Sequence, residues 1–303
     1  MAELSLSELY VYPIKSAAGI ALKQAQLTAR GLQYDRRWMV VDGKGKFVTQ
    51  RRFPRMALMA VSIDEAASCL RLRAPGMPEH SVWIDFSAGL NSQGGNGPFE
   101  QIGVEIWGDR TTAIAVGPES QKWFSDFIGI DCQLVYMPNN CTRPTAHGKL
   151  GNHHLVSFAD GYPYLLISEA SLSGLNQKLS DQGKAPVTMQ RFRPNFVISG
   201  VETAHDEDSW QQIKIGEAVF DLPKLCDRCS IPNVDPATGD YPTDQHGRRT
   251  LEPTQTLSSY RYWDKGIWFG QNCIQSSPIP AAAKITLHVG EPVKVLKLKA
   301  RSN

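Results

Sequence analysis

The sequence has no long hydrophobic run, little net charge and few cysteines, and each of these features argues against a class of protein. No stretch approaches the roughly 18 apolar residues of a membrane span, and the first ten residues lack a basic segment followed by an apolar one. The net charge of +2 gives no argument for a nucleic-acid or membrane-surface partner. We therefore expect a cytoplasmic protein that binds neither nucleic acid nor a membrane.

Six cysteines in 303 residues do not make the dense pattern of a secreted disulfide framework, and we expect all of them to be reduced. The chain is long enough for one large domain or two ordinary ones. Its contents of 42% hydrophobic and 20% charged residues are ordinary for a protein with a buried core.

Short apolar runs separated by turn residues predict a mainly β fold with a few helices (α+β), arranged as a barrel or sandwich. The expected strands cover residues 3–12, 38–41, 46–50, 56–63, 70–73, 81–86, 101–107, 111–116, 195–199, 211–215, 218–222, 284–289 and 292–298. Helices are expected at residues 121–128 and 169–179, the second with Ser168 as its N-cap. A boundary within residues 117–131 divides the chain into two packed domains, residues 1–117 and 118–303.

Two cysteines three positions apart follow one expected strand. Arg228 lies between Cys226 and Cys229, and a neighbouring guanidinium stabilises a thiolate, which binds soft metals. A zinc site would need further ligands, for which His246 and Cys273 are the available partners. A thioredoxin-type pair is disfavoured by the prolines that follow, an iron–sulfur cluster would need more cysteines, and two buried structural thiols remain an alternative.

Other features give weaker signals. Eight arginines crowd two regions and are expected on solvated strand edges, unless a subset converges on one anion: Arg30, Arg36, Arg37, Arg51, Arg52, Arg55, Arg191 and Arg193. The adjacent His153 and His154 would face opposite sides of a strand, which argues against a shared metal. Residues 91–98 indicate a hairpin loop, and the sequence has neither a Gly-rich dinucleotide fingerprint nor a Gly-x-Ser-x-Gly elbow.

Seven motifs in order along the chain resemble one known family. They are Tyr12-Pro13-Ile14-Lys15-Ser16, Asp35-Arg36-Arg37-Trp38, Phe158-Ala159-Asp160-Gly161-Tyr162-Pro163, Arg191-Phe192-Arg193-Pro194-Asn195, Cys226-Asp227-Arg228-Cys229, Val234-Asp235-Pro236-Ala237-Thr238-Gly239 and Phe269-Gly270-Gln271-Asn272. This is the pattern of MOSC-domain proteins with a MOSC N-terminal β-barrel domain, which include the mitochondrial amidoxime reducing component and its bacterial relatives. The resemblance covers nearly the whole chain and implies a MOSC β-barrel with an N-terminal β-barrel-like domain packed against it.

The resemblance implies a molybdenum cofactor, held through a pterin dithiolene, with Cys229 as the catalytic protein ligand to the metal and Cys226 as a neighbour. Fixed cationic groups bind the cofactor's phosphate well. The implied cofactor contacts are Lys15, Ser16 and Arg36 in the N-terminal part and Asp160, Gly161, Tyr162, Arg193, Asn195, Asp227, Arg228 and Asn272 in the C-terminal part. Relatives often carry serine where Asp227 stands, so we expect its carboxylate to point away from the cofactor or to accept a pterin N–H.

The function implied by the resemblance is the two-electron reduction of small N-hydroxylated compounds, which splits an N–O bond and releases an amine and water. The sequence ends at Asn303 without the ferredoxin-like domain of some bacterial relatives and begins without the anchor of the mitochondrial ones. Electrons are therefore expected from a separate protein, a flavin reductase or a ferredoxin-like protein. The alternative is a carrier of the cofactor, or of sulfur on Cys229, without turnover, although no fused sulfur-mobilising domain is present. Pyridoxal phosphate binding is also associated with the family.

Overall fold

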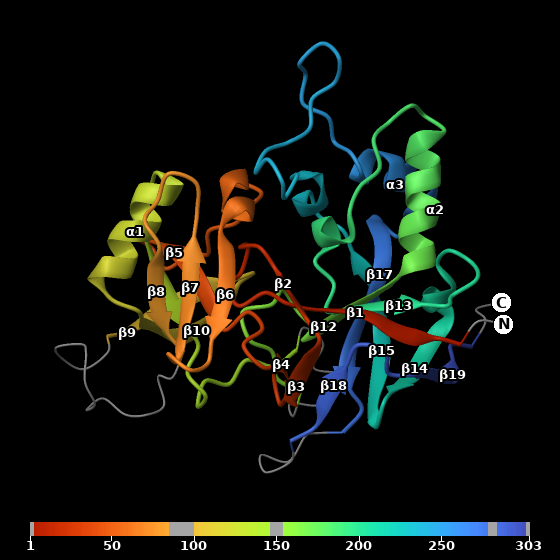
Figure 1. Ribbon diagram of the computed structural model, residues 1–303, viewed down its shortest axis with the longest axis horizontal. Helices are drawn as coiled ribbons and strands as arrows, with labels where there is room; N and C mark the ends of the chain where they lie inside the picture. The colour runs from red at the N-terminus through yellow and green to blue at the C-terminus, as the bar shows by residue number, and fades with distance from the viewer. Residues whose placement is uncertain (1–2, 85–99, 146–153, 278–283, 301–303) are drawn as a thin grey trace.

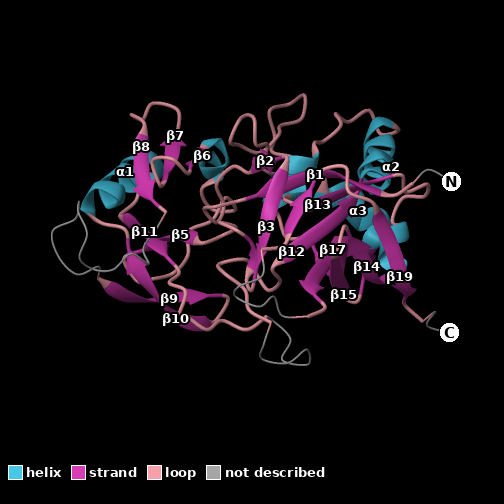
Figure 2. Cartoon of the chain, turned by 60° about the horizontal axis from the view of Figure 1, so that its bottom comes forward, coloured by secondary structure: helices cyan, strands magenta, loops and turns pink. Residues whose placement is uncertain are grey.

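The computed structural model describes residues 3–84, 100–145, 154–277 and 284–300. In these ranges the chain forms two β-rich lobes that lie side by side (Figures 1 and 2). The larger lobe is built on a nine-stranded sheet in the order β19-β14-β15-β17-β12-β13-β1-β2, with β16 paired to β17. Its strands are β1 Ser5–Val11, β2 Ile20–Leu22, β12 Tyr164–Ser168, β13 Phe196–Ser199, β14 Trp210–Ile215, β15 Ala218–Asp227, β16 Tyr262–Trp263, β17 Gly266–Gln275 and β19 Val293–Leu298.

Three smaller sheets complete the β-structure. The four-stranded sheet contains β5 Trp38–Asp42, β11 Cys132–Tyr136, β10 Asp109–Ala115 and β9 Gln101–Ile106. The two three-stranded sheets contain β18 Thr286–His288, β3 Gln24–Thr28 and β4 Gly31–Leu32, and β6 Ala60–Asp64, β7 Cys69–Arg73 and β8 His80–Trp83. The predicted mainly β fold with a few helices is confirmed.

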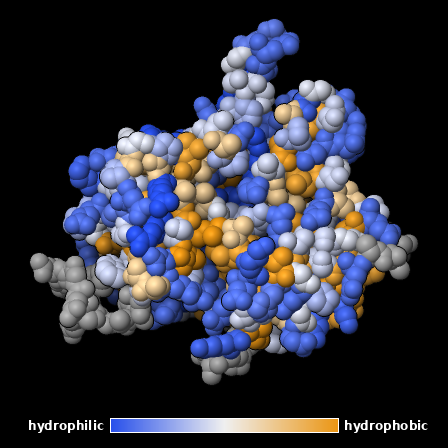
Figure 3. Space-filling model, in the orientation of Figure 1, coloured by the Kyte–Doolittle hydropathy of each residue, from blue (hydrophilic) through white to orange (hydrophobic). Residues whose placement is uncertain are grey.

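The helices are short and lie on the outside of the sheets (Figure 1). They are α1 Pro118–Ile128, α2 Glu169–Ser180 and α3 Thr254–Arg261, with 3-10 turns η1 Pro54–Leu58, η3 Met189–Phe192, η4 Asp206–Ser209 and η5 Ile231–Asn233. Among the described residues, no helix has both the length and the apolar character that a membrane crossing requires. The hairpin of residues 242–250 projects from the body as a hydrophilic tip (Figure 3).

The chain crosses between the lobes several times. β1 and β2, at the start of the chain, pair within the large sheet, whereas β5, β9, β10 and β11 form the four-stranded sheet of the smaller lobe. The chain returns to the large sheet with β12, which pairs with β13 and β17. β18, near the end of the chain, pairs with β3. Segments distant in sequence are therefore brought together where the lobes meet, and the division at residue 117 stays a prediction.

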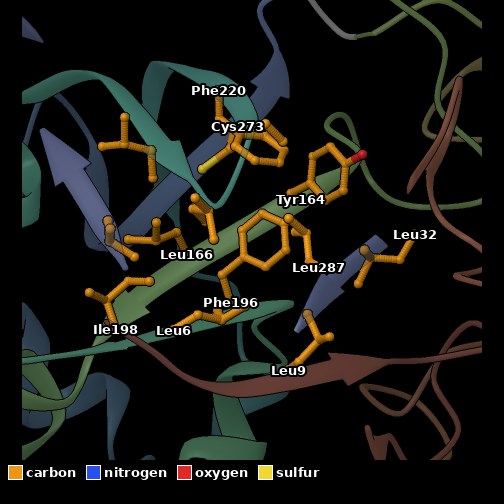
Figure 4. Packing of buried hydrophobic residues seen from close by; sticks show 14 of the residues in the cluster. Leu6, Leu9, Leu32, Tyr164, Leu166, Phe196, Ile198, Phe220, Cys273 and Leu287 are labelled. Carbon is orange, nitrogen blue, oxygen red and sulfur yellow. The ribbon is translucent and has the colours of Figure 1, made fainter. Parts of the chain in front are cut away.

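The core of the larger lobe is centred on three aromatic rings from three strands. The Tyr164 ring stacks on Phe196 with centroids 5.1 Å apart, and Phe220 packs edge-on against both (Figure 4). All three side chains are almost fully buried, and such aromatic pairs add about 0.5–1.5 kcal/mol each beyond the area that they bury. These contacts fix β12, β13 and β15, whose ends lead into the pocket described below.

Several local expectations are confirmed and others are wrong. Ser168 caps α2 as expected, its hydroxyl accepting a hydrogen bond from the Ser171 amide. Residues 56–63 are not one strand, because Pro54 starts the turn η1 and only β6 is extended. The strand expected at residues 218–222 continues as β15 to Asp227, so Cys226 lies on a strand and not on a loop. The loop at residues 91–98, the end of the strand at 81–86 and His153 lie outside the described residues.

Candidate functional site

A pocket lies where the two lobes meet, and it brings together all twelve residues expected at the site. The smaller part of its wall comes from the N-terminal segment and the larger part from the loops that follow β11, η3 and β15. Its lining also includes residues that were not among the expected cofactor contacts: Thr49, Arg51, Ala159, Tyr164, Leu165, Phe192 and Ile231. The roles of the twelve residues remain predictions, but their convergence is a property of the fold.

Cys229 lies on the turn between β15 and η5. The strand ends when the Arg228 amide donates to the Ile267 carbonyl of β17, at 2.7 Å, and Pro232 then helps to start η5. The Cys229 thiol is partly exposed, lines the pocket and has no hydrogen-bond partner among the described residues. It is the thiol that a bound group could reach without breaking an existing contact.

Arg228 contacts Cys226 and not Cys229. Its Nη1 lies 3.2 Å from the Cys226 sulfur, and its Nη2 donates to the Phe192 carbonyl at 2.8 Å. Burial raises the pKa of the Cys226 thiol, and Arg228 offsets this only in part. In this structure the guanidinium of Arg228 therefore contacts the Cys226 thiol, and its effect on Cys229 stays a prediction. The Nε of Arg228 is buried and has no acceptor, which leaves one donor for a ligand.

Two guanidinium groups lie against the ring of Tyr12. The distances from the ring centroid are 4.4 Å to Arg36 and 4.2 Å to Arg193. Arg36 also donates to the Asn195 side-chain oxygen at 2.9 Å and forms an ion pair with the buried Asp35. Burial lowers the pKa of Arg193 to about 10, and repulsion from Arg36 contributes. One carboxylate for two neighbouring guanidinium groups leaves positive charge that an anion would neutralise.

The backbone at this point is strained. Ser16, Arg36 and Arg193 have φ angles of 68°, 48° and 59°, in the left-handed region that non-glycine residues rarely adopt. Such residues cost of order 1–3 kcal/mol each and cluster at ligand sites, where the surrounding structure holds them. All three line the pocket.

Lys15 and Asp160 form an ion pair at the pocket wall, and the Lys15 ammonium also donates to the Phe158 carbonyl at 2.9 Å. Burial lowers the pKa of Lys15. Burial would raise the pKa of Asp160, but the charge of Lys15 and the hydrogen bonds from Lys15 and Trp107 outweigh it and hold the Asp160 pKa below its usual value. Arg143, which the sequence did not indicate, fixes this loop from behind. Its guanidinium donates to the carbonyls of residues 157, 159 and 160 at 2.8, 2.6 and 2.9 Å.

Two of the expected contact residues are occupied by structural hydrogen bonds. The Asn195 amide donates to the Tyr10 carbonyl at 3.1 Å, and its oxygen accepts from Leu165 and Arg36. The Asn272 amide donates to the Leu225 carbonyl of β15 at 3.1 Å. Both side chains line the pocket, but they hold its wall in place.

Asp227, Tyr162 and Gly161 complete the expected set and also line the pocket. An Asp227 carboxylate oxygen accepts from the Ile267 amide at 3.1 Å, which gives this departure from the family pattern a structural role. Burial raises the pKa of Tyr162 to about 12, so its phenol stays protonated at neutral pH.

The motif of residues 234–239 joins the lobes beneath Cys229. Asp235 pairs with Arg191 at 2.9 Å, and the Tyr241 hydroxyl donates to the Arg51 carbonyl at 3.1 Å. Gly239 has a φ of 64°, and an added Cβ would lie 2.5 Å from the side chain of Leu58 in η1. The motif therefore packs against η1 and does not line the pocket, and Tyr241, just after it, holds the backbone of Arg51, which does.

The residues present fit an anionic group that also offers a soft metal. Five basic residues line the pocket (Lys15, Arg36, Arg51, Arg193 and Arg228), against two acidic ones (Asp160 and Asp227). The described residues contain no cluster of three or more His, Cys, Asp or Glu side chains that could hold a metal by themselves. Cys273 is buried in the core and His246 lies on the projecting hairpin, so neither joins Cys229 at the pocket as a zinc ligand (Figure 4). A metal at Cys229 would need ligands from a bound molecule.

Comparison with known proteins gives two family matches in this chain. The MOSC N-terminal beta barrel domain matches residues 3–131, and the MOSC domain matches residues 153–294. The mitochondrial amidoxime reducing component 2 of Bos taurus is 32% identical over 302 residues, which cover 95% of this chain and 82% of that protein. The mitochondrial amidoxime-reducing component 1 of Mus musculus is 32% identical over 305 residues, covering 96% and 82%. The molybdenum cofactor sulfurase of Oryza sativa subsp. japonica is 30% identical over 283 residues; these cover 89% of this chain but 32% of the sulfurase, so this chain spans about a third of its length.

Proposed function

The chain belongs to the family of proteins that join a MOSC N-terminal beta barrel domain to a MOSC domain, and from this premise we propose that it is a molybdenum-cofactor-dependent oxidoreductase. Its substrates would be small N-hydroxylated compounds, reduced to an amine and water. The observation that carries the proposal is the Cys229 thiol, without a hydrogen-bond partner in the described structure, at a pocket lined by five basic residues. Those basic residues suit a phosphate-bearing cofactor, and the thiol suits its metal.

Each part of the pocket would have a distinct task with the cofactor bound. Arg36 and Arg193 would bind its phosphate, because their charges exceed that of their one carboxylate partner, Asp35. The Arg228 Nε would donate to the same anion. Cys229 would be the protein ligand to molybdenum, and the metal would supply the two-electron redox chemistry. The buried wall built on Tyr12 would keep water away from the phosphate contacts.

We further propose that electrons come from a separate protein, either a flavin reductase or a ferredoxin-like protein. Among the described residues that line the pocket, Gly161 is the single glycine, so this part of the wall offers no Gly-rich loop for a dinucleotide. Pyridoxal phosphate is a poorer fit, because Lys15, the one lysine of the lining, is ion-paired with Asp160 and is not free to form a Schiff base. All six cysteines are unpaired, which supports a reducing compartment such as the cytoplasm.

A carrier that holds the cofactor without turnover is the second candidate, favoured by the match to the molybdenum cofactor sulfurase over 89% of this chain. The same pocket would serve a carrier, because binding requires the phosphate contacts and the thiol but no productive access for a substrate. Turnover separates the two candidates.

Metal content tests the cofactor part of the proposal. The protein is purified from a host that makes the cofactor, and molybdenum is measured by elemental mass spectrometry beside Cys229→Ser and Cys226→Ser. We expect near-stoichiometric molybdenum that is largely lost in the first variant and kept in the second, because Arg228 already occupies the Cys226 thiol. Zinc in place of molybdenum, lost equally from both variants, would refute the proposal.

Turnover is then measured as benzamidoxime reduction with reduced methyl viologen as an artificial donor. Molybdenum-dependent formation of benzamidine supports the enzyme. A loaded protein with no turnover supports the carrier. Reduction directly from a nicotinamide by the purified chain would show that no donor protein is needed.

A further inference from the structure

A second cavity is lined by residues of β3, β4, β5 and β11 and by Glu65, Ser68 and Ile84 at the ends of β6 to β8. Its walls combine the apolar side chains of Leu32 and Ile84 with the rings of Trp38 and Tyr136, whose centroids are 5.2 Å apart. The cavity does not share a lining residue with the pocket at Cys229. Its wall includes Arg37 and Trp38 of the Asp35-Arg36-Arg37-Trp38 motif, whereas Arg36 lines the first pocket.

Two buried donors in this wall have no acceptor. Trp38 is fully buried and its indole N–H is unpaired, and the Arg37 Nε is also buried and unpaired. By contrast, the indole N–H of Trp123, another buried tryptophan of the same lobe, donates to the Pro78 carbonyl at 2.8 Å. An unsatisfied buried donor costs about 1–3 kcal/mol, so two of them in one cavity wall indicate a missing acceptor.

The charge at the cavity is also uncompensated. The Arg37 Nη2 donates to the Tyr136 hydroxyl and the Asn139 side-chain oxygen, both at 2.9 Å. Arg30, 8% exposed, donates to the Asn139 carbonyl at 3.1 Å. Among the described residues neither guanidinium has a carboxylate partner, and burial lowers the pKa of both, with mutual repulsion adding to the effect on Arg30. Glu65 is the single acidic residue in the lining and is exposed.

The backbone around the cavity shows the strain that accompanies ligand sites. Tyr34 and Ser68 both line it, with φ angles of 69° and 50°. Like the three strained residues of the first pocket, they are held by the surrounding fold at a cost in stability.

We propose that this second cavity binds a small organic acid, with the carboxylate on the Arg37 Nε and the Trp38 indole N–H and the apolar body against Leu32 and Ile84. A carboxylate supplies acceptors to both unpaired donors and neutralises the guanidinium pair. The apolar walls favour an organic anion over an inorganic one, because a phosphate ion would leave Leu32 and Ile84 without a contact. The proposal does not depend on the function assigned to the Cys229 pocket.

Isothermal titration calorimetry with benzoate tests the proposal, with benzamide as the neutral analogue of the same shape and inorganic phosphate as the small anion. We expect benzoate to bind with a Kd in the millimolar range or tighter, and at least tenfold more tightly than benzamide. The comparison with phosphate is made in Arg193→Gln, which lacks a phosphate contact of the first pocket, and there benzoate should again bind at least tenfold more tightly. The indole N–H resonance of Trp38, assigned with Trp38→Phe, should move on addition of benzoate. No benzoate binding, or equal binding of benzamide, overturns the proposal. Phosphate that binds Arg193→Gln more tightly than benzoate does, and is lost on the further change Trp38→Phe, overturns the organic-acid assignment.

Variants place the ligand in this cavity and not at Cys229. Trp38→Phe and Arg37→Lys should each weaken benzoate about tenfold, because the first removes one N–H and the second removes the guanidinium Nε while keeping the charge. Trp123→Phe, which removes an indole N–H already satisfied within the fold, should leave benzoate affinity unchanged. Circular dichroism confirms that each variant is folded. Benzoate binding that is kept in both cavity variants but lost in Arg193→Gln belongs to the first pocket and overturns the proposal.

Discussion

Removing the Arg193 guanidinium should weaken anion binding while leaving the stability of the empty protein nearly unchanged. The change is Arg193→Gln. In the structure, Arg193 lies over Tyr12 at 4.2 Å and donates to the Ala17 carbonyl at 2.6 Å. It has no carboxylate partner among the described residues, and Arg36 lies over the same ring.

The two sides of the stability balance are of similar size. The variant loses one hydrogen bond, about 1 kcal/mol net, and a partly desolvated cation–π contact of about 1–2 kcal/mol. Against this, lowering the pKa of Arg193 from 12.5 to about 10 corresponds to roughly 3 kcal/mol that disfavours the charged form in the fold, chiefly through burial. We therefore expect the free energy of unfolding without cofactor to change by no more than about 1 kcal/mol. A charge-assisted hydrogen bond to phosphate contributes about 1.5–3 kcal/mol, so phosphate affinity should fall by about 10- to 100-fold.

Arg191→Gln is the matched control, two positions earlier in the same motif. Arg191 pairs with Asp235 at 2.9 Å and does not line the pocket, so its loss should reduce stability by about 1–3 kcal/mol with little effect on phosphate. Urea unfolding and phosphate calorimetry on protein from a host without the cofactor give both quantities, and molybdenum content from a competent host gives a third. If Arg193→Gln unfolds the protein as Arg191→Gln does, and phosphate affinity stays at the wild-type value, the reasoning about the Tyr12 site is wrong.

Three further outcomes follow from single contacts. Iodoacetamide at neutral pH should alkylate Cys229 before Cys226, because burial raises the Cys226 pKa and Arg228 covers its sulfur; peptide mass spectrometry showing the reverse order would contradict this. Gly239→Ala should lower the free energy of unfolding by more than about 2 kcal/mol, since its Cβ would lie 2.5 Å from a leucine side chain of η1. Gly247, with a φ of 73°, has nothing within 4 Å of an added Cβ, so Gly247→Ala should cost only the backbone strain of about 1–2 kcal/mol. If urea unfolding shows the same loss of stability in both glycine variants, the packing of Gly239 against η1 is not important for stability. Burial, then Arg261 and Lys178, lowers the pKa of His205 to about 4, so the unfolded chain takes up a proton below pH 6.5 before the folded one does. This contribution to stability is fully present above pH 6.5 and is lost as the pH falls towards 4. His205→Asn, which tolerates the left-handed backbone, should remove that part of the pH dependence of unfolding, and unchanged curves would refute it.

Local signals in the sequence identify elements whose cause is local. The Ser168 cap of α2 is such a case, because the capping hydroxyl and the amide that it accepts are three residues apart. The helix α3 was missed because its sequence, TQTLSSYR, has no apolar stripe and is fixed by contacts such as that of Arg261 with the Trp268 carbonyl at 2.9 Å. The strand β17 was also missed, because Gly270, with a φ of 82°, interrupts its alternation where an added Cβ would meet Leu166.

The site was predictable as a set of residue types but not as a set of partners. The motif that contains Arg191 and Arg193 reads as two similar arginines, and only the fold assigns one to Asp235 and the other to the pocket. Likewise, the sequence places Arg228 beside both cysteines, whereas the extension of β15 to Asp227 turns it towards Cys226. Arg143 is out of reach of sequence reasoning, since the carbonyls that it binds lie 14–17 positions further along the chain.

Several rules of local consistency are broken where the proposed ligand would lie. Five basic residues face two acidic ones in the pocket, and three of its residues hold a left-handed backbone. None of this stabilises the empty protein, because like charges repel and left-handed residues are strained. The support comes from groups outside the lining, such as Arg143 behind the Asp160 loop and Asp35, which accepts from the Tyr12 amide at 2.8 Å. The buried contacts that hold these cations in place are repaid only when an anion binds. Changes in the lining should therefore weaken anion binding with little loss of stability, whereas changes in the supporting residues should lower the free energy of unfolding.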